Sequence, residues 1–155
     1  MFTIEIPGRA PLAVKHVALD YNGTIAVDGK LPPSVRSRIR ALCQSVPVYV
    51  LTADTYGTAS LQCEDMGVAV RTFPQAGAAV CKERIVRELG EGVVCLGNGF
   101  NDIPMFDAAA LSIAILEGEG LCAALLPHAH VLARSAEEAL DLLCKPDRLR
   151  ATLRT

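Results

Sequence analysis

Short apolar runs alternate along the chain with longer stretches in which apolar residues recur at helical spacing. The apolar runs have the length of buried strands, and they predict strands at residues 14–19, 47–51, 68–70, 93–96, 111–115 and 131–132. Helical spacing and capping residues predict helices at 34–44, 55–65, 77–89, 103–108 and 135–143, with another starting at 117–120. This alternation predicts an α/β fold: a three-layer, doubly wound, mostly parallel sheet with helices on both faces.

Local signals add smaller features to this outline. Residues 2–6 alternate apolar and polar positions and then reach Pro7-Gly8, which predicts a short strand ended by a turn. The Asp28-Gly29 pair predicts a small hairpin flap after the first core strand. The basic residues 148–154 follow Pro146, and we expect a frayed helix there. No repeat or linker divides the sequence, so we expect one domain over residues 1–155.

Composition narrows the classes of protein that fit. The chain is 51% hydrophobic with a formal net charge of −2, and it has no run of basic residues that would favour nucleic acid. No apolar run is long enough to cross a membrane, and the N-terminus lacks signal-peptide features, so we expect a cytoplasmic protein without membrane contact. The six cysteines lie far apart without a C-x-x-C pair, which disfavours a zinc site or a disulfide framework.

Three predicted strands end in polar residues. Asp20 follows the first core strand, Thr52-Ala53-Asp54 follows the second, and residues 98–102 follow the fourth. Adjacent parallel strands bring their carboxyl ends to one edge of the sheet, where Lys82 near a helix start would also lie. A carboxylate, a hydroxyl, an ammonium and a second carboxylate form a set suited to phosphoryl transfer with Mg²⁺.

Simpler interpretations of the same residues stay open at this point. Asp20 could only start an Asx-turn before Asn22-Gly23, and Lys82 could be a solvated helix residue. Asp54 fits either a helix N-cap or a site residue.

The polar segments also carry a family resemblance. D-Y-N-G-T at 20–24, V-L-T-A-D-T at 50–55, the lysine helix and G-N-G-F-N-D at 97–102 resemble, in order, the four motifs of the haloacid dehalogenase-like (HAD) superfamily. The particular variants are similar to the phosphorylation domain of P-type ATPases, and most of all to small soluble P-type ATPase-like proteins. This resemblance implies a Rossmann-like HAD fold, here without a cap domain, because the intervals between motifs are too short to hold one.

The resemblance implies a role for each matching residue. Asp20 would be the nucleophile that forms an aspartyl-phosphate, and Thr52 and Lys82 would take part in catalysis. Phosphate would be bound by Thr52, Ala53, Lys82 and Gly23, with Thr24 supporting the loop. The Mg²⁺ ligands would be Asp20, Asn22 through its backbone carbonyl, Asn98 and Asp102, with Asn101 beside them.

Two positions depart from the pattern of most phosphatases in the superfamily. Asn22 replaces the Asp that acts as general acid and base, and an amide cannot do this at neutral pH. Asn98 replaces an Asp of the metal motif, which removes one negative charge. The sequence therefore predicts a slow Mg²⁺-dependent phosphohydrolase.

Two other functions fit the same departures. One is a catalytically weak regulatory or partner-binding protein, and the other is a detached P-type ATPase phosphorylation domain that works with another chain. The expected partner is a phosphorylated substrate, either a small molecule or a macromolecule. A homo-oligomer that closes the open site is a further alternative.

Overall fold

The computed structural model describes residues 1–54 and 57–155. Its strands are β1 (Phe2–Ile4), β2 (Leu12–Val14), β3 (His16–Asp20), β4 (Val48–Thr52), β5 (Ala69–Thr72), β6 (Val93–Gly97), β7 (Leu111–Ile115) and β8 (Val131–Ala133). Its helices are α1 (Pro33–Leu42), α2 (Ala59–Gln62), α3 (Ala78–Leu89), α4 (Ile103–Asp107), α5 (Ala136–Cys144) and α6 (Asp147–Leu153), with 3-10 turns η1 (Phe100–Asp102) and η2 (Ala123–His128).

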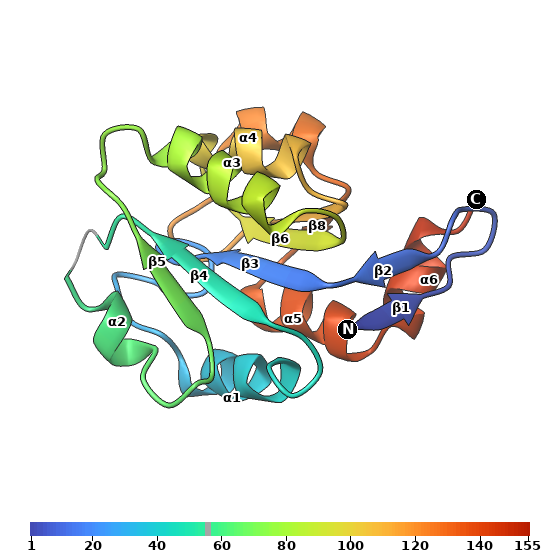
Figure 1. Ribbon diagram of the computed structural model, residues 1–155, viewed down its shortest axis with the longest axis horizontal. Coiled ribbons are helices and arrows are strands. Elements are labelled where there is room, and N and C mark those ends of the chain that lie inside the picture. The colour runs from blue at the N-terminus through green and yellow to red at the C-terminus, as the bar shows by residue number, and fades with distance from the viewer. Residues whose placement is uncertain (55–56) are drawn as a thin grey trace.

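Within the described residues, six strands form one parallel sheet in the order β5-β4-β3-β6-β7-β8. Figure 1 shows α3 and α4 above this sheet and α1 and α5 below it. One apolar cluster fills the α1 and α5 side, and a second lies beneath α3 and α4. The predicted three-layer α/β fold is confirmed, and no cap domain is inserted between the described elements.

The predicted first core strand is two strands. Residues 12–14 form β2, which pairs with β1 in a separate antiparallel ribbon, and the chain enters the main sheet only at His16. The change of sheet occurs at Lys15, where the N–H groups of Lys15 and His16 both donate to the carbonyl of Gly92, at 2.8 and 3.2 Å. Lys15 and His16 interrupt the apolar pattern at this point, and the prediction of one strand over residues 14–19 did not take this break into account.

The Asp28-Gly29 hairpin is present as predicted. Asp28 and Gly29 have φ values of 51° and 73°, and Val27 and Lys30 exchange both backbone hydrogen bonds. Two consecutive positive φ values are the geometry of a type I′ turn. The hairpin packs down rather than projecting: the Tyr21 hydroxyl donates to the Gly29 carbonyl at 3.1 Å, and the Glu119 carboxylate accepts from the Asp28 N–H at the same distance.

Three predicted helices differ in the structure. The helix expected at 55–65 is reduced to α2, with Thr55 and Tyr56 outside the described residues. No helix starts at 117–120, because Glu117 bonds the N–H of Ala136 and Glu119 that of Asp28. Residues 147–153 form the ordered helix α6 rather than a frayed one, because Leu149 and Leu153 are buried.

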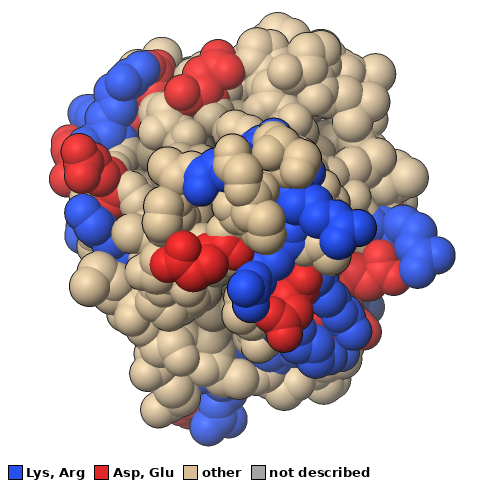
Figure 2. Space-filling view, turned by 90° about the vertical axis from the view of Figure 1, so that its right-hand side faces the viewer, with Lys and Arg blue, Asp and Glu red and all other residues tan. Residues whose placement is uncertain are grey.

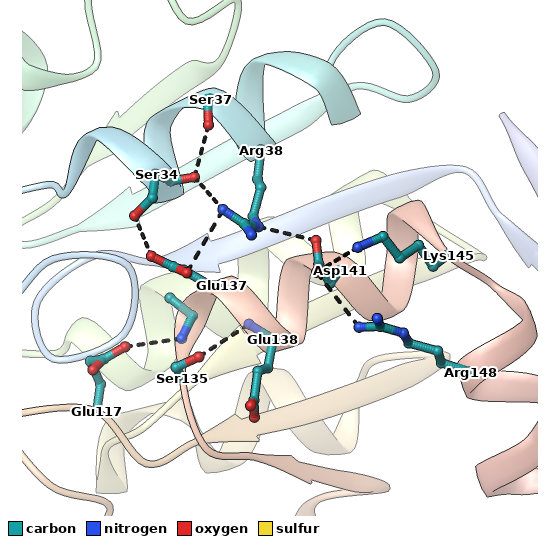
Figure 3. Close-up of polar contacts among 11 residues, drawn as sticks. Ser34, Ser37, Arg38, Glu117, Ser135, Glu137, Glu138, Asp141, Lys145 and Arg148 are labelled. Atoms are coloured by element: carbon teal, nitrogen blue, oxygen red, sulfur yellow. Dashed lines mark hydrogen bonds and ion pairs between the residues drawn. The ribbon is translucent and has the colours of Figure 1, made fainter.

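Polar side chains join α1 to α5 on the lower face (Figure 3). The Arg38 guanidinium donates to Asp141 Oδ1 at 3.0 Å and to the Ser34 carbonyl at the same distance, and the Ser34 hydroxyl donates to Glu137. Asp141 also binds the ammonium of Lys145 at 2.8 Å. These contacts fix the two helices that support the sheet from below.

The surface on the side of β1, β2 and α6 carries acidic and basic side chains close together (Figure 2). Several of them form ion pairs, such as Arg150 with Asp147 at 2.9 Å. This face therefore has no patch of a single charge sign. Among the described residues, no helix has both the length and the hydrophobicity needed to cross a bilayer.

Candidate active site

Asp20 is the last residue of β3 and lies at the edge where the carboxyl ends of the strands meet. Its side chain is nearly buried, with the residue 7% exposed. One carboxylate oxygen, Oδ1, accepts from the ammonium of Lys82 at 2.7 Å, and Oδ2 accepts from the Thr24 hydroxyl at 2.8 Å. A buried carboxylate without such partners would be strongly destabilising, so these contacts stabilise Asp20 at the strand end.

Lys82 connects the two carboxylates of the site. It projects from α3 and is 2% exposed, and its Nζ lies 2.7 Å from Asp20 Oδ1, 2.6 Å from Asp102 Oδ1 and 3.1 Å from Asn101 Oδ1. An ammonium has three N–H donors, so all three are used. Burial alone would lower the pKa of Lys82, but the Asp20 and Asp102 carboxylates raise it above its ordinary value.

Asp102 holds the loop after β6 and is fully buried. Its Oδ2 accepts from the backbone N–H groups of Asn98 and Gly99, at 3.0 and 2.9 Å. A Cβ on Gly97 would lie 2.6 Å from the Asp102 carboxyl carbon, so the turn requires glycine there. Burial raises the pKa of Asp102 to about 6, with the Asp20 charge adding to the rise and Lys82 opposing it.

The loops after β3 and β6 are in contact with each other. The Asn98 Oδ1 lies 3.1 Å from the Thr24 hydroxyl, and its Nδ2 donates to the Gly120 carbonyl at 3.0 Å. Gly23 has a φ of 76°, and a Cβ there would lie 2.3 Å from Asn98 Nδ2. Asn22 and Asn98 are therefore held on adjoining loops of the same site.

Asn22 lies two residues after Asp20 and lines the site. Its side-chain Oδ1 is buried and has no hydrogen-bond partner among the described residues. Its backbone carbonyl likewise accepts no hydrogen bond from the described part of the chain. These are two oxygen atoms available to a ligand.

The loop after β4 supplies a hydroxyl. Thr52 Oγ1 accepts from the Asp54 N–H at 2.8 Å, so the Thr52 O–H remains free to donate. The Asp54 carboxylate accepts from the Ala59 N–H at 2.8 Å, at the first turn of α2. Asp54 is not the N-cap of α2, because Thr58 holds that position, and Asp54 does not line the cavity described next.

The side chains surround a cavity of about 420 Å³. Six of the eight sequence-predicted site residues lie on its wall: Asp20, Asn22, Thr52, Ala53, Lys82 and Asn98. Gly23 and Asp102 lie behind the wall, where they shape the loops. None of the hairpin residues 25–30 contributes to the lining.

Sequence reasoning missed four residues of this wall, namely Phe73, Ala78, Gly99 and Phe100. Phe100 is 69% exposed although aromatic, and its place within G-N-G-F-N-D was an available signal. Phe73 had no such signal, because its position depends on how β5 leads into α3.

The donor set suits a hard divalent cation. Asp20 supplies a carboxylate on the cavity wall, Asp102 supplies a second one directly behind it, and Asn22 and Asn98 supply amide and carbonyl oxygens. The described residues contain no group of three or more His, Cys, Asp or Glu placed to hold a metal ion. Mg²⁺ is typically held by one or two carboxylates together with waters and phosphate oxygens. With Lys82, the two carboxylates carry a net charge of −1, so a divalent cation would bring the site to +1, which favours binding of a phosphate anion.

Comparison with models of protein families gives no match for this chain. Two proteins of Methanocaldococcus jannaschii are similar in sequence. The uncharacterized protein MJ0072 is 46% identical over 39 residues, which are 25% of this chain and 89% of that protein. The uncharacterized protein MJ0073 is 30% identical over 80 residues, which are 48% of this chain and 86% of that protein. The chain belongs to the family of these two archaeal proteins.

Solved structures with the same fold include phosphatases and a hydrolase. A cobalt-bound deoxy-D-mannose-octulosonate 8-phosphate phosphatase from Haemophilus influenzae has a TM-score of 0.72 at 14% identity, covering 92% of this chain and 94% of that one. The Moraxella catarrhalis 3-deoxy-D-manno-octulosonate 8-phosphate phosphatase, in complex with magnesium and phosphate, has a TM-score of 0.71 at 16% identity, covering 91% and 94%.

A Streptomyces avermitilis protein classed with the HAD-family hydrolases has a TM-score of 0.65 at 19% identity, covering 82% and 80%. This chain therefore has the HAD Rossmann-like fold.

Proposed function

We propose that this protein is a Mg²⁺-dependent phosphohydrolase that works through an aspartyl-phosphate on Asp20. The observation that carries the proposal is the buried Lys82 ammonium bound between Asp20 and Asp102 where β3 ends. A buried ion pair often stabilises a protein no more than apolar side chains of similar size would. The placement of Asp20 and Lys82 on the wall of an open cavity therefore favours a chemical role for this pair.

The residues suggest a division of labour. An Asp20 carboxylate oxygen attacks phosphorus and forms a bond to it. The bond between phosphorus and the leaving-group oxygen breaks, and the leaving-group oxygen departs with the electron pair. Phosphorylation removes one carboxylate charge, and the Lys82 N–H that donated to Asp20 is then free to donate to the phosphoryl group. The Thr52 O–H is a second donor for phosphate oxygens. Mg²⁺, held by the oxygen set described above, would neutralise charge on the transferring phosphoryl group.

Asn22 sets the expected speed of turnover. General acid–base catalysis contributes about 10²- to 10⁴-fold, and the Asn22 amide cannot protonate a leaving group or activate water. We therefore expect slow release of phosphate and a preference for good leaving groups. The neighbouring folds support the phosphatase class, while the P-type ATPase-like motifs support a comparatively persistent phosphoenzyme.

Phosphate release from para-nitrophenyl phosphate tests the proposal. We expect activity with Mg²⁺, loss of activity with a chelator, and none above background for the Asp20→Asn variant. Asp20→Asn keeps the size of the side chain, so folding can be checked by circular dichroism. Equal rates for the wild type and Asp20→Asn would reject the proposed nucleophile.

A further inference from the structure

A second cavity adjoins the phosphate site. It measures about 580 Å³, which is within the range of about 300–1,000 Å³ typical of small-molecule sites, and it lies between α3 and the edge strand β5 (Figure 1). Phe73 lines this groove and also the wall of the Asp20 cavity, so the two cavities share this residue. The groove is lined by Tyr49, Val70, Arg71, Thr72, Phe73, Arg84, Ile85, Glu88 and Leu89.

Two arginines line this groove from different elements. Arg71 is paired in register with Leu51, whose side chain belongs to the apolar cluster beneath α3, so Arg71 lies on the same face of the sheet. Arg84 comes from α3 itself. The apolar parts of the lining include Tyr49, Ile85 and Leu89, which pack against the same cluster.

The charges of these arginines are poorly compensated. Arg71 forms no ion pair or side-chain hydrogen bond with the described residues. Arg84 has a contact of 3.8 Å with Glu88, and both side chains are 67% exposed. An exposed pair at this distance contributes little, so both guanidinium groups are available to an anion. With Glu88 counted, the groove carries a net charge of +1.

We propose that the groove binds a second anionic group of the phosphorylated substrate, and this rests on the proposed function of the Asp20 site. This second group would be a carboxylate or a phosphate, because both accept paired hydrogen bonds from the N–H donors of arginine. The connecting part of the molecule would lie against Phe73, which suits a planar or apolar spacer.

The strand spacing sets the length of such a substrate. Asp20 pairs with Leu51 and Leu51 pairs with Arg71, so two strand spacings separate the backbone of Asp20 from that of Arg71. At about 4.8 Å for each spacing, this is roughly 10 Å. The arginine side chain reaches part of that distance, so one aromatic ring between the two anionic groups is a suitable spacer.

Three aryl phosphates test the proposal: phenyl phosphate, para-carboxyphenyl phosphate and para-phenylene bisphosphate. We expect kcat/KM to be about tenfold higher for at least one of the two probes with a second anion, mainly through KM. Arg71→Gln and Arg84→Gln should each remove most of that advantage and leave phenyl phosphate unchanged. Comparing the two probes that carry a second anionic group separates a carboxylate preference from a phosphate preference.

Arg87→Gln is the matched control, because Arg87 lies on the same helix but pairs with Glu83 at 2.8 Å outside the groove. An equal loss in Arg87→Gln would indicate a general charge effect and would overturn the proposal. Absence of any preference for the two probes with a second anionic group would overturn it as well.

A binding experiment separates this inference from the proposed chemistry. Calorimetry on Asp20→Asn with phenylphosphonate and para-carboxyphenylphosphonate requires no turnover. Tighter binding of the carboxylated probe, lost in the Asp20→Asn/Arg71→Gln double variant, would support the groove even if no phosphate were released from any ester. Equal binding of the two phosphonates would reject the groove, whatever the outcome of the phosphatase assay.

Discussion

Asn22 is the residue at which the proposed chemistry departs most from an efficient phosphatase. It lines the Asp20 cavity with a buried, unpartnered amide oxygen. Asn22→Asp would place a titratable oxygen at that position with little change of shape. We expect release of phosphate from an aryl ester to rise by about 10² or more, as general acid–base catalysis is restored.

Asn101→Asp provides the comparison, because it adds the same charge to the same cavity at a different position. We expect no comparable gain from it. An equal gain in both variants, or none in Asn22→Asp, would contradict the role assigned to position 22 and would favour a partner-binding function.

Lys82 is the second residue with a large expected effect. Lys82→Met would leave the buried Asp20 and Asp102 carboxylates without their shared cation. Removing one partner of a buried ion pair costs about 3–5 kcal/mol, and we expect a loss of that order in the free energy of unfolding measured by urea with chelator present. Mg²⁺ should recover part of it. A loss below about 1 kcal/mol would show that Lys82 does not stabilise the pair.

The proposed site residues could be chosen from the sequence because they follow strand ends. Asp20, Thr52 and Asn98 each come at or directly after an apolar run, and parallel pairing brings those ends together. Their hydrogen bonds were not predictable. The sharing of Lys82 between two carboxylates depends on the packing of α3 over the sheet, and so does the place of Phe73 between two cavities.

At the scale of elements, the contact between α1 and α5 depends on Asp141. Its carboxylate binds Lys145 and Arg38, and these hydrogen bonds hold the pKa of Asp141 below its ordinary value of 3.8. We expect Asp141→Asn to lower the free energy of unfolding by about 1 kcal/mol near neutral pH. Because the folded-state pKa of Asp141 is depressed, this contribution to stability is fully present above pH 3.8. It is lost as the pH falls through the folded-state pKa.

The measurement is urea unfolding of the wild type and Asp141→Asn at neutral and acidic pH. Asp147→Asn is the control, because Asp147 is 86% exposed and pairs only with Arg150 among the described residues. If the difference in free energy of unfolding between the wild type and Asp141→Asn were the same at neutral and acidic pH, the electrostatic explanation would be contradicted.

The sequence predicted the elements whose signals are local. The Asp28-Gly29 turn needs only two residues with positive φ, and the main strands are continuous apolar runs. Predictions failed where distant groups decide the backbone. Gly92 divides β2 from β3 by accepting two N–H groups, and Glu117 bonds Ala136 instead of starting a helix. Neither partner can be inferred from the neighbouring residues.

For the whole molecule, binding at the site should stabilise the fold. A ligand at 100 times its Kd adds about 2.7 kcal/mol to the free energy of unfolding, which corresponds to a rise in Tm of roughly 5–10 °C for a chain of this size. We expect Mg²⁺ together with inorganic phosphate to produce such a rise in thermal denaturation, and a chelator to reverse it. Asp102→Asn should reduce the effect. A Tm independent of both ions would argue against a metal and phosphate site.

Detection of the phosphoryl group on Asp20 tests the central claim most directly. The protein is mixed with Mg²⁺ and an aryl phosphate, quenched in acid, and measured by intact-protein and peptide mass spectrometry. We predict one added phosphoryl group, located on the peptide that contains Asp20, absent from Asp20→Asn and less abundant at steady state in Asn22→Asp because that variant hydrolyses it faster. Phosphate release without any such adduct in the wild type, or an adduct that persists in Asp20→Asn, would contradict the account.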